Sequence, residues 1–193
     1  MKLLIATAFF AASAIACHGA IIINAAKVGG NIVFTGNGSI DLAGAVMGGT
    51  GTLGDPAAVV PNSDILGFDF AGGGTTNLQF YTATSVGNFG AGGTTTSPTA
   101  TGDSFLVDAN LVGLPVGYIS NTPISFTSTF VGTSFVSLGI TSPGTFVWTL
   151  PGDTVTLNVA AVPEPSTYIA GAGLLGLGAL VLYRRRKQAK AAQ

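Results

Sequence analysis

The chain has 193 residues with a formal net charge of −1, 8% charged residues, 29 glycines, one cysteine and one histidine. Its basic residues gather at the two ends, and Lys27 is the single base between Leu3 and Tyr183. Binding to nucleic acid depends on Lys and Arg against phosphate, so this distribution argues against a nucleic-acid partner. The apolar content comes partly from two terminal segments and does not indicate a polytopic membrane protein.

The first twenty residues have the form of a secretory signal peptide. Lys2 supplies a short basic region, an apolar stretch follows over Leu3–Ala16, and small residues come next. We expect signal peptidase to cleave after Ala20, with Ala16 as the alternative site. Cys17 follows an Ala-Ile-Ala run that faintly resembles a lipoprotein box, although the usual leucine three residues before the cysteine is missing.

Cleavage after Ala20 would remove Cys17 and His18 with the signal. The exported part would then have no disulfide, no thiol nucleophile, no imidazole base and no histidine metal ligand. Its acidic residues are Asp41, Asp55, Asp64, Asp69, Asp103, Asp108, Asp153 and Glu164. We therefore expect an acidic domain with no cofactor, no metal and no enzymatic activity.

Residues 21–162 have the length of one domain. Gly, Thr, Ser, Asn, Val, Ile and Phe dominate there, a composition that disfavours helix and favours strands joined by tight turns. The sequence predicts an all-β fold, either an antiparallel β-sandwich or a barrel-like domain. It would lie between an N-terminal signal helix and a C-terminal transmembrane helix.

Alternating apolar and polar residues predict individual strands. Val155–Val159 alternates strictly, and Thr145–Leu150 lies between two turns that each contain Pro-Gly. Phe126–Phe130 and Phe135–Leu138 are looser strand candidates.

Glycine-rich segments predict turns and loops. Gly36-Asn37-Gly38 predicts a hairpin that joins Asn31–Thr35 to Ser39–Leu42. Ala43–Pro61 and Gly87–Thr101 are predicted as Gly-rich loops, and Gly113–Gly117 has no clear assignment.

Residues 163–193 combine three features in order: Pro163-Glu164-Pro165, an uncharged apolar run, and the basic cluster Arg184, Arg185, Arg186 and Lys187. As a helix the apolar run Tyr168–Tyr183 rises about 24 Å. The bilayer core is roughly 30 Å thick. Inclusion of Ser166 and Thr167 in the first turn and snorkelling of the arginines would lengthen it. We expect a transmembrane helix over about residues 166–183.

The basic cluster at the end of this run sets its orientation. Basic flanks remain on the cytoplasmic side, so the C-terminus is expected inside and residues before Pro163 outside. A buried core helix of the same length is the alternative interpretation. The two prolines fix their own φ and favour extended backbone before them. This keeps Glu164 accessible, either as a recognition element or within a plain rigid linker.

Gly171, Gly173 and Gly176 match the G-x-G-x-x-G pattern of dinucleotide sites. That site needs a preceding strand and an acid about 20 residues further on. No acid follows Glu164 in this chain. The glycines are better interpreted as small residues that allow close packing of a membrane helix.

These C-terminal features resemble the PEP-CTERM sorting signal of exported bacterial proteins. The resemblance covers about the last thirty residues, with a tail (Gln188–Gln193) somewhat longer than a minimal signal. The strand pair predicted at Phe146–Leu150 and Thr154–Val159 also looks like one that often precedes this signal. The resemblance implies processing by an exosortase, a membrane cysteine transpeptidase-like enzyme of Gram-negative bacteria. It also implies a transient stay in the inner membrane, a final place at the cell surface, and an association with exopolysaccharide or biofilm.

The exported domain leaves three functions open. The first is a structural surface or matrix protein, which we favour. The second is a carbohydrate-binding module in which Trp148, Tyr81 or Tyr118 stacks on sugar rings. For Trp148 the ordinary interpretation is core packing, because it lies in the middle of a predicted strand.

The third is a glycosidase, which can work with two carboxylates alone. Asp64 with Asp69, or Asp103 with Asp108, would be the pair. Asp residues in turns or on solvated faces are the ordinary interpretation. The same acids, with backbone carbonyls of the Gly-rich loops, are also candidate Ca²⁺ ligands, but the chain has no D-x-D spacing.

Overall fold

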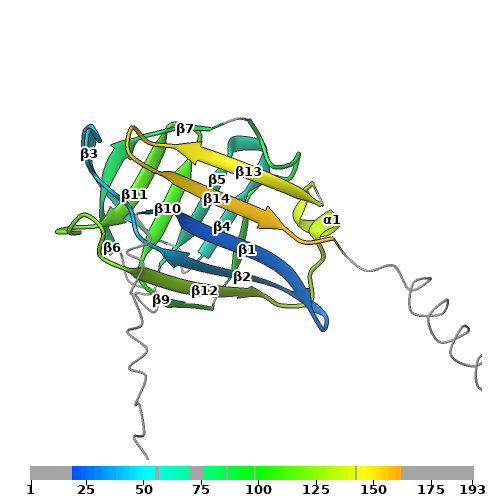
Figure 1. The fold of residues 1–193 in the computed structure, drawn as a ribbon. Coiled ribbons are helices and arrows are strands. Elements are labelled where there is room, and N and C mark those ends of the chain that lie inside the picture. The colour runs from blue at the N-terminus through cyan, green and yellow to red at the C-terminus, as the bar shows by residue number, and fades with distance from the viewer. Residues whose placement is uncertain are drawn as a thin grey trace, which may run out of the picture.

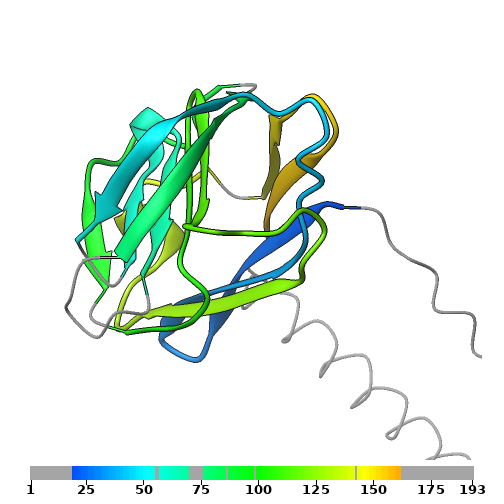
Figure 2. The same ribbon diagram turned by 90° about the vertical axis from the view of Figure 1, so that its left-hand side faces the viewer.

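The computed structural model describes residues 19–54, 57–69, 76–85, 87–97, 99–141 and 143–161. Within these residues the chain forms two seven-stranded sheets that pack face to face (Figure 1). Figure 2 shows the two sheets as separate layers. This confirms the predicted all-β sandwich. The described helical structure is limited to α1 (Phe135–Leu138) and the 3₁₀ turn η1 (Pro61–Ser63). The predicted signal and transmembrane helices lie outside the described residues.

Sheet A consists, in spatial order, of β7 (Thr84–Ser85), β13 (Gly144–Thr149), β14 (Thr154–Val159), β1 (Ile21–Val28), β2 (Asn31–Gly38), β12 (Ile124–Phe130) and β9 (Ala100–Gly102). Sheet B consists of β3 (Met47–Leu53), β6 (Thr76–Thr82), β11 (Leu111–Pro115), β10 (Phe105–Asp108), β5 (Ile65–Phe68), β4 (Ala57–Val60) and β8 (Thr95–Ser97). Each described strand pairing is antiparallel except that of β1 with β14, in which Ile21 lies opposite Val155 and Ala25 opposite Val159. The first and last strands therefore lie side by side inside sheet A (Figure 1).

The two ends of sheet A differ in which end of the domain's chain they carry. We call the end with the start of β1 and the β13–β14 turn the acidic end, because Asp41 and Asp153 lie there, with the Asp41 amide on the Asp153 carboxylate. We call the other the exit end, because β14 finishes there and the chain continues toward residue 161 (Figure 1). The β1–β2 turn is also at the exit end, since Val28 pairs with Asn31.

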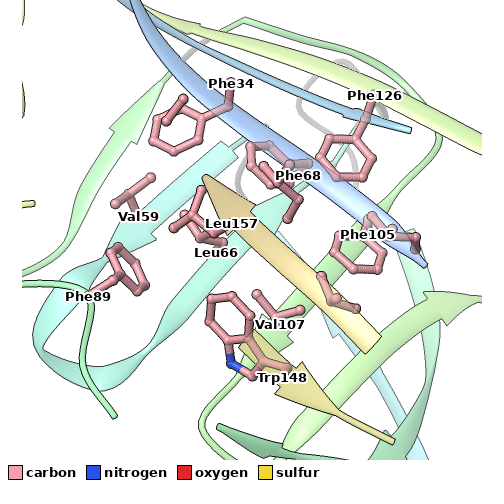
Figure 3. Packing of buried hydrophobic residues seen from close by; sticks show 14 of the residues in the cluster. Phe34, Val59, Leu66, Phe68, Phe89, Phe105, Val107, Phe126, Trp148 and Leu157 are labelled. Atoms are coloured by element: carbon pink, nitrogen blue, oxygen red, sulfur yellow. The ribbon is translucent and has the colours of Figure 1, made fainter. Parts of the chain in front are cut away.

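Aromatic rings from both sheets fill the space between the layers (Figure 3). Phe126 of sheet A stacks on Phe68 and Phe105 of sheet B, with ring centroids 4.5 Å and 5.0 Å apart. Phe34, also from sheet A, contacts Phe68 with the ring centroids 6.0 Å apart. Such pairs contribute about 0.5–1.5 kcal/mol each beyond the area that they bury. The rings therefore hold the two sheets in one relative position.

The predicted hairpin at Gly36-Asn37-Gly38 is wrong. β2 runs straight through these residues to Gly38, and Ser39–Leu42 is not a strand. A Cβ on Gly36 would lie 2.1 Å from the ring of Phe126. Gly36 therefore lies inside the strand, and its lack of a side chain lets the ring of Phe126 pack directly on the backbone. Glycine in a strand can mark such a close approach as well as a turn.

Two of the predicted loops contain strands. β3 and β4 lie within Ala43–Pro61, and β8 and the start of β9 lie within Gly87–Thr101. The third stretch, Gly113–Gly117, provides the end of β11. β3 has three glycines in seven residues and forms a strand through its pairing with β6. Pairing between distant segments outweighs the weak strand propensity of glycine here.

The segment Phe135–Leu138, predicted as a strand, is the helix α1. The Ser134 side chain accepts from the Ser137 amide, and the Ser137 hydroxyl accepts from the Ser134 amide, which completes a capping box. Gly139 ends the helix in the left-handed region at φ 68°. Serines at the N-cap and three residues later, followed by Gly, are helix signals that outweigh the short alternation.

We predict that Leu157→Ala destabilises the domain by about 2–5 kcal/mol, because Leu157 is fully buried in β14. Thr156→Ala, one residue earlier and facing outward, is the control and should cost less than about 1 kcal/mol. Urea unfolding followed by circular dichroism measures both. Equal costs would show that β14 contributes little to the core.

Candidate functional site

A row of uncharged polar side chains crosses the outer face of sheet A. Cross-strand pairing places the members in one line, because directly opposed residues share a face of the sheet. In spatial order the row is Thr145, Asn158, Asn24, Thr35, Thr127 and Thr101, from β13, β14, β1, β2, β12 and β9. We call this row the Thr/Asn ladder. Neighbouring strands are about 4.8 Å apart, so the ladder spans about 24 Å.

The members of the ladder are held by their strands and partly by each other. The Thr145 hydroxyl lies 3.2 Å from Asn158 Oδ1, and Asn158 Nδ2 lies 3.5 Å from Asn24 Oδ1. Asn24, Thr35, Thr101 and Thr145 are exposed, whereas Thr127 and Asn158 are half-buried. The face therefore offers both donors and acceptors, and no member carries a charge.

Two shallow hollows border the ladder at its two sides. One, of about 400 Å³, is lined by Asn24, Thr145 and Asn158 together with the end of β14. The other, of about 270 Å³, is lined by Thr35, Thr101 and Thr127 with neighbours on β2, β9 and β12. The polar row thus runs between two depressions on one broad face. Its chemistry fits hydrogen bonding to a neutral, hydroxyl-rich surface.

Residues of the ladder alternate with core residues along every long strand. Ile23 and Ala25 flank Asn24 and are fully buried, and Phe34 beside Thr35 is also fully buried. The alternation of these residue types was visible in the sequence for β14. Their alignment was not, because Asn24 meets Asn158 only through the parallel pairing of strands that lie at opposite ends of the domain.

The aromatic side chains considered for sugar stacking do not form a surface platform. Trp148 is fully buried, which confirms its predicted core position, and Tyr81 is 8% exposed. Trp148 packs edge-on against Phe89 at 6.3 Å (Figure 3). Tyr118 is half-buried at the acidic end. Trp148 and Tyr81 are therefore too buried in this fold to stack on a sugar ring.

Asp64 and Asp69, the first carboxylate pair considered, are both buried and both hydrogen-bonded to serine hydroxyls. Ser85 Oγ donates to Asp64 at 2.6 Å, and Ser104 Oγ donates to Asp69 at 2.9 Å. Asp64 stands in the left-handed region at φ 58°, directly after η1. These contacts indicate that both carboxylates have structural roles, in which they stabilise a turn and a strand end.

Two buried polar atoms lack a hydrogen-bond partner among the described residues: Asp64 Oδ1 and the indole nitrogen of Trp148. The two residues share a neighbour, because Ser85 donates a hydrogen bond to Asp64 and lies opposite Trp148 in sheet A. Unpaired buried groups carry a cost in free energy. Hydrogen bonding of buried polar side-chain atoms is therefore less complete in this region than in the rest of the described core.

Asp103 and Asp108, the second pair considered, lie at strand ends. The Asp103 carboxylate accepts from the Ser125 amide at 2.8 Å, which fixes the corner between β9 and β12. Asp108 is the last residue of β10. Within the described part of the chain, His, Cys, Asp and Glu side chains form no group of three or more that could hold a metal ion.

A polar network joins three loops at the acidic end. The Tyr118 hydroxyl accepts from the Ile40 amide at 2.8 Å and donates to the Thr122 carbonyl at 2.7 Å. Nearby, Asp41 accepts from the Ser120 hydroxyl at 3.0 Å. Burial, and to a smaller extent the charge of Asp153, raise the pKa of Tyr118 above its ordinary 10.0, against the opposing effect of the Ile40 hydrogen bond.

This raised pKa predicts an alkaline limit to stability. The folded state keeps the Tyr118 proton longer than the unfolded chain does, so its contribution is complete below pH 10 and is lost as the pH rises through the folded pKa. Unfolding free energy measured from pH 8 to 12 should fall less steeply above pH 10 in Tyr118→Phe. That variant should also lose about 1 kcal/mol at neutral pH through its missing hydrogen bonds. Parallel pH curves for the two proteins would contradict the assignment.

The bond expected to be cut by signal peptidase lies at the first strand of sheet A. Ile21 is fully buried and pairs with Val155. A Cβ on Gly38 would lie 2.0 Å from the Ala20 carbonyl oxygen, so the neighbouring strand covers this peptide closely. Access to the Ala20–Ile21 bond therefore requires β1 to be outside the sheet. Cleavage after Ala20 has to precede folding of this strand.

The sorting features follow directly after the sandwich. The Ala160 amide donates to the Ala25 carbonyl at 2.9 Å, and the described chain ends at Ala161. Pro163, Glu164 and Pro165, and the cluster Arg184, Arg185, Arg186 and Lys187, lie outside the described residues. Among the helices that are described, none has the length and apolar character to cross a membrane.

Comparison with known protein families decides what the C-terminal segment is. The family model for the PEP-CTERM protein-sorting motif matches residues 161–187. The chain carries a PEP-CTERM sorting motif. This motif is that of exosortase-targeted surface proteins, so the chain is directed to export and membrane-associated sorting. No curated protein and no solved structure matches the chain. The PEP-CTERM match begins at residue 161, directly after Ala160, whose amide donates to the Ala25 carbonyl of β1.

Proposed function

We propose that this protein is a non-catalytic matrix protein of the bacterial surface, which uses the Thr/Asn ladder to bind neutral exopolysaccharide. Signal peptidase removes the N-terminal segment, the C-terminal helix holds the chain in the inner membrane, and an exosortase cuts at Pro163-Glu164-Pro165. The sorting motif supports this route. The observation that carries the binding mode is the line of six uncharged polar residues across sheet A.

Hydroxyl and amide side chains suit a polysaccharide because each can donate to and accept from sugar hydroxyls. A row at strand spacing repeats this chemistry along about 24 Å, so an extended polymer would make many weak bonds at once. Each bond adds little alone, since net hydrogen bonds are worth about 0.5–1.5 kcal/mol. Such a surface favours a protein that remains bound to a matrix through repeated contacts.

A non-catalytic role is favoured by the positions of the acids. Asp64 and Asp69 bond to serine hydroxyls inside the fold, and Asp103 fixes a corner of the backbone. A glycosidase needs two carboxyl groups that face the same sugar. Neither hollow beside the ladder is lined by an acidic residue. These three carboxylates thus stabilise the fold, whereas the Thr/Asn ladder is accessible to a ligand.

We predict that Thr35→Val with Thr127→Val weakens binding to neutral exopolysaccharide extracted from the producing cells by about fivefold or more, since two hydroxyls are lost and the branched shape is kept. Affinity electrophoresis and co-sedimentation measure the change. Thr50→Val with Thr52→Val, on exposed positions of β3 in sheet B, is the matched control and should bind as the parent does. Equal weakening by both pairs, or none by either, would reject the ladder as the binding surface.

The processing route predicts the mass of the mature protein. Protein recovered from the native surface should begin at Ile21 and end within Pro163–Thr167, because the first cut precedes the folding of β1 and the second lies beyond β14. Intact-mass spectrometry reads both ends together. A start at Cys17 would assign cleavage to Ala16, and retention of Tyr168–Lys187 would replace exosortase cutting by permanent anchoring.

A further inference from the structure

The exit end of the sandwich carries exposed apolar side chains together with the exported domain's single base. Val28, Val131 and Val136 are 58%, 67% and 89% exposed, and Lys27 is exposed beside Val28. We call these four residues the exit patch. They come from the end of β1, the segment after β12, and α1.

Hydrogen bonds and pairing bring the parts of the exit patch to one place. Val28 lies opposite Asn31, and Asn31 Oδ1 accepts from the Gly132 amide at 3.0 Å. Gly132 follows Val131 directly, and α1 with Val136 begins three residues later. Figure 1 shows the β1–β2 turn, α1 and the end of β14 at the same end of the sandwich.

The chain itself limits how far this end can lie from the membrane. The last sheet hydrogen bond is that of Ala160 to Ala25, and the apolar run begins at Tyr168. The residues between them reach at most about 25 Å when fully extended, at about 3.5 Å per residue. This reach is no longer than β1 itself, at about 26 Å, so an anchored C-terminal run keeps the exit end within one strand length of the bilayer.

The charges of the two ends agree with this orientation. Asp41, Asp103 and Asp153 lie at the acidic end, close to the starts of β1 and β12. Lys27 lies at the exit end. A membrane surface that contains anionic lipids attracts nearby bases by about 1 kcal/mol each. Val46, Val116 and Ile119 are also exposed apolar residues, but the acidic end carries the carboxylates of Asp41, Asp103 and Asp153, which an anionic surface repels.

We propose that the exit patch is a membrane-contact surface: its three valines enter the headgroup region and Lys27 pairs with lipid phosphates while the protein awaits cleavage. This inference rests on the proposed C-terminal anchoring. It means that the sandwich stands on the bilayer with the sorting motif at its base. The Thr/Asn ladder on the side of sheet A then remains open to the matrix.

The test uses residues 21–193, which lack the signal segment and contain no native cysteine, in vesicles of phosphatidylethanolamine and phosphatidylglycerol that contain nitroxide lipids. A fluorophore is placed on one introduced cysteine at a time: Gly30→Cys at the exit end, Thr122→Cys at the acidic end, or Leu175→Cys in the apolar run. Gly30 and Thr122 are exposed, and a Cβ on Gly30 meets no atom within 4 Å. We expect strong quenching at positions 30 and 175 and little at 122.

Two matched variants separate contact from simple tethering. Val28→Ser, Val131→Ser and Val136→Ser together should at least halve quenching at position 30. Val46→Ser, Val116→Ser and Ile119→Ser together should leave it unchanged. Lys27→Gln should lower the ratio of molecules whose exit patch contacts the bilayer to those whose patch does not by about fivefold in anionic vesicles. It should have no effect in vesicles of phosphatidylcholine alone.

The outcomes are distinct. Absence of quenching at position 175 would reject anchoring, and with it both the proposed route and this surface. Quenching at 175 with none at 30, or with a value at 30 that the exit-patch variant does not change, would overturn the membrane contact alone. Quenching at 30 that appears only when an exosortase is present in the vesicles would assign the patch to the enzyme and overturn the lipid contact.

Discussion

The parallel pairing of β1 with β14 is the constraint on which the rest of the structure depends. It joins the first and last strands of the domain inside sheet A, where each has a neighbour on both sides. Sheet A cannot be complete until residues about 130 positions apart have met, because Asn24 pairs with Asn158. The same pairing aligns the two halves of the Thr/Asn ladder. Folding, the polar face and the position of the sorting motif thus follow from one contact.

A parallel pair also sends its two termini in opposite directions. The chain enters at the acidic end, next to Asp153, and leaves at the exit end, next to Ala25. The signal peptide and the C-terminal run would therefore hold opposite ends of a folded sandwich, with β1 alone about 26 Å long. Because Ile21 is buried, cleavage of the Ala20–Ile21 bond would have to come before sheet A closes, and the folded sandwich would then be held at its exit end alone.

Period-two alternation made β12 and β14 predictable, since each has one buried and one more solvated face, and Pro-Gly turns on either side made β13 predictable. Alternation also predicted that Trp148 is buried. One error came from a short alternation that is helix α1, and the others arose where glycine was taken as a turn or loop. Gly36 and Gly51 instead admit the rings of Phe126 and Phe80, which approach to 2.1 Å and 2.5 Å of a Cβ built there. The ladder could not be predicted, because register between distant strands depends on tertiary pairing.

The short interval between sheet and motif has a mechanical consequence for processing. Ala160 is fixed by its bond to Ala25, and the motif match starts at the next residue. Cutting at Pro163-Glu164-Pro165 therefore leaves every described strand intact, whereas cutting a few residues earlier would remove part of β14. β14 already has β13 and β1 as neighbours, so sheet A offers the following segment no free edge beside β14, and the two prolines favour extended backbone there. An exosortase acting on the motif would then cut between the end of an inner strand and the expected membrane helix.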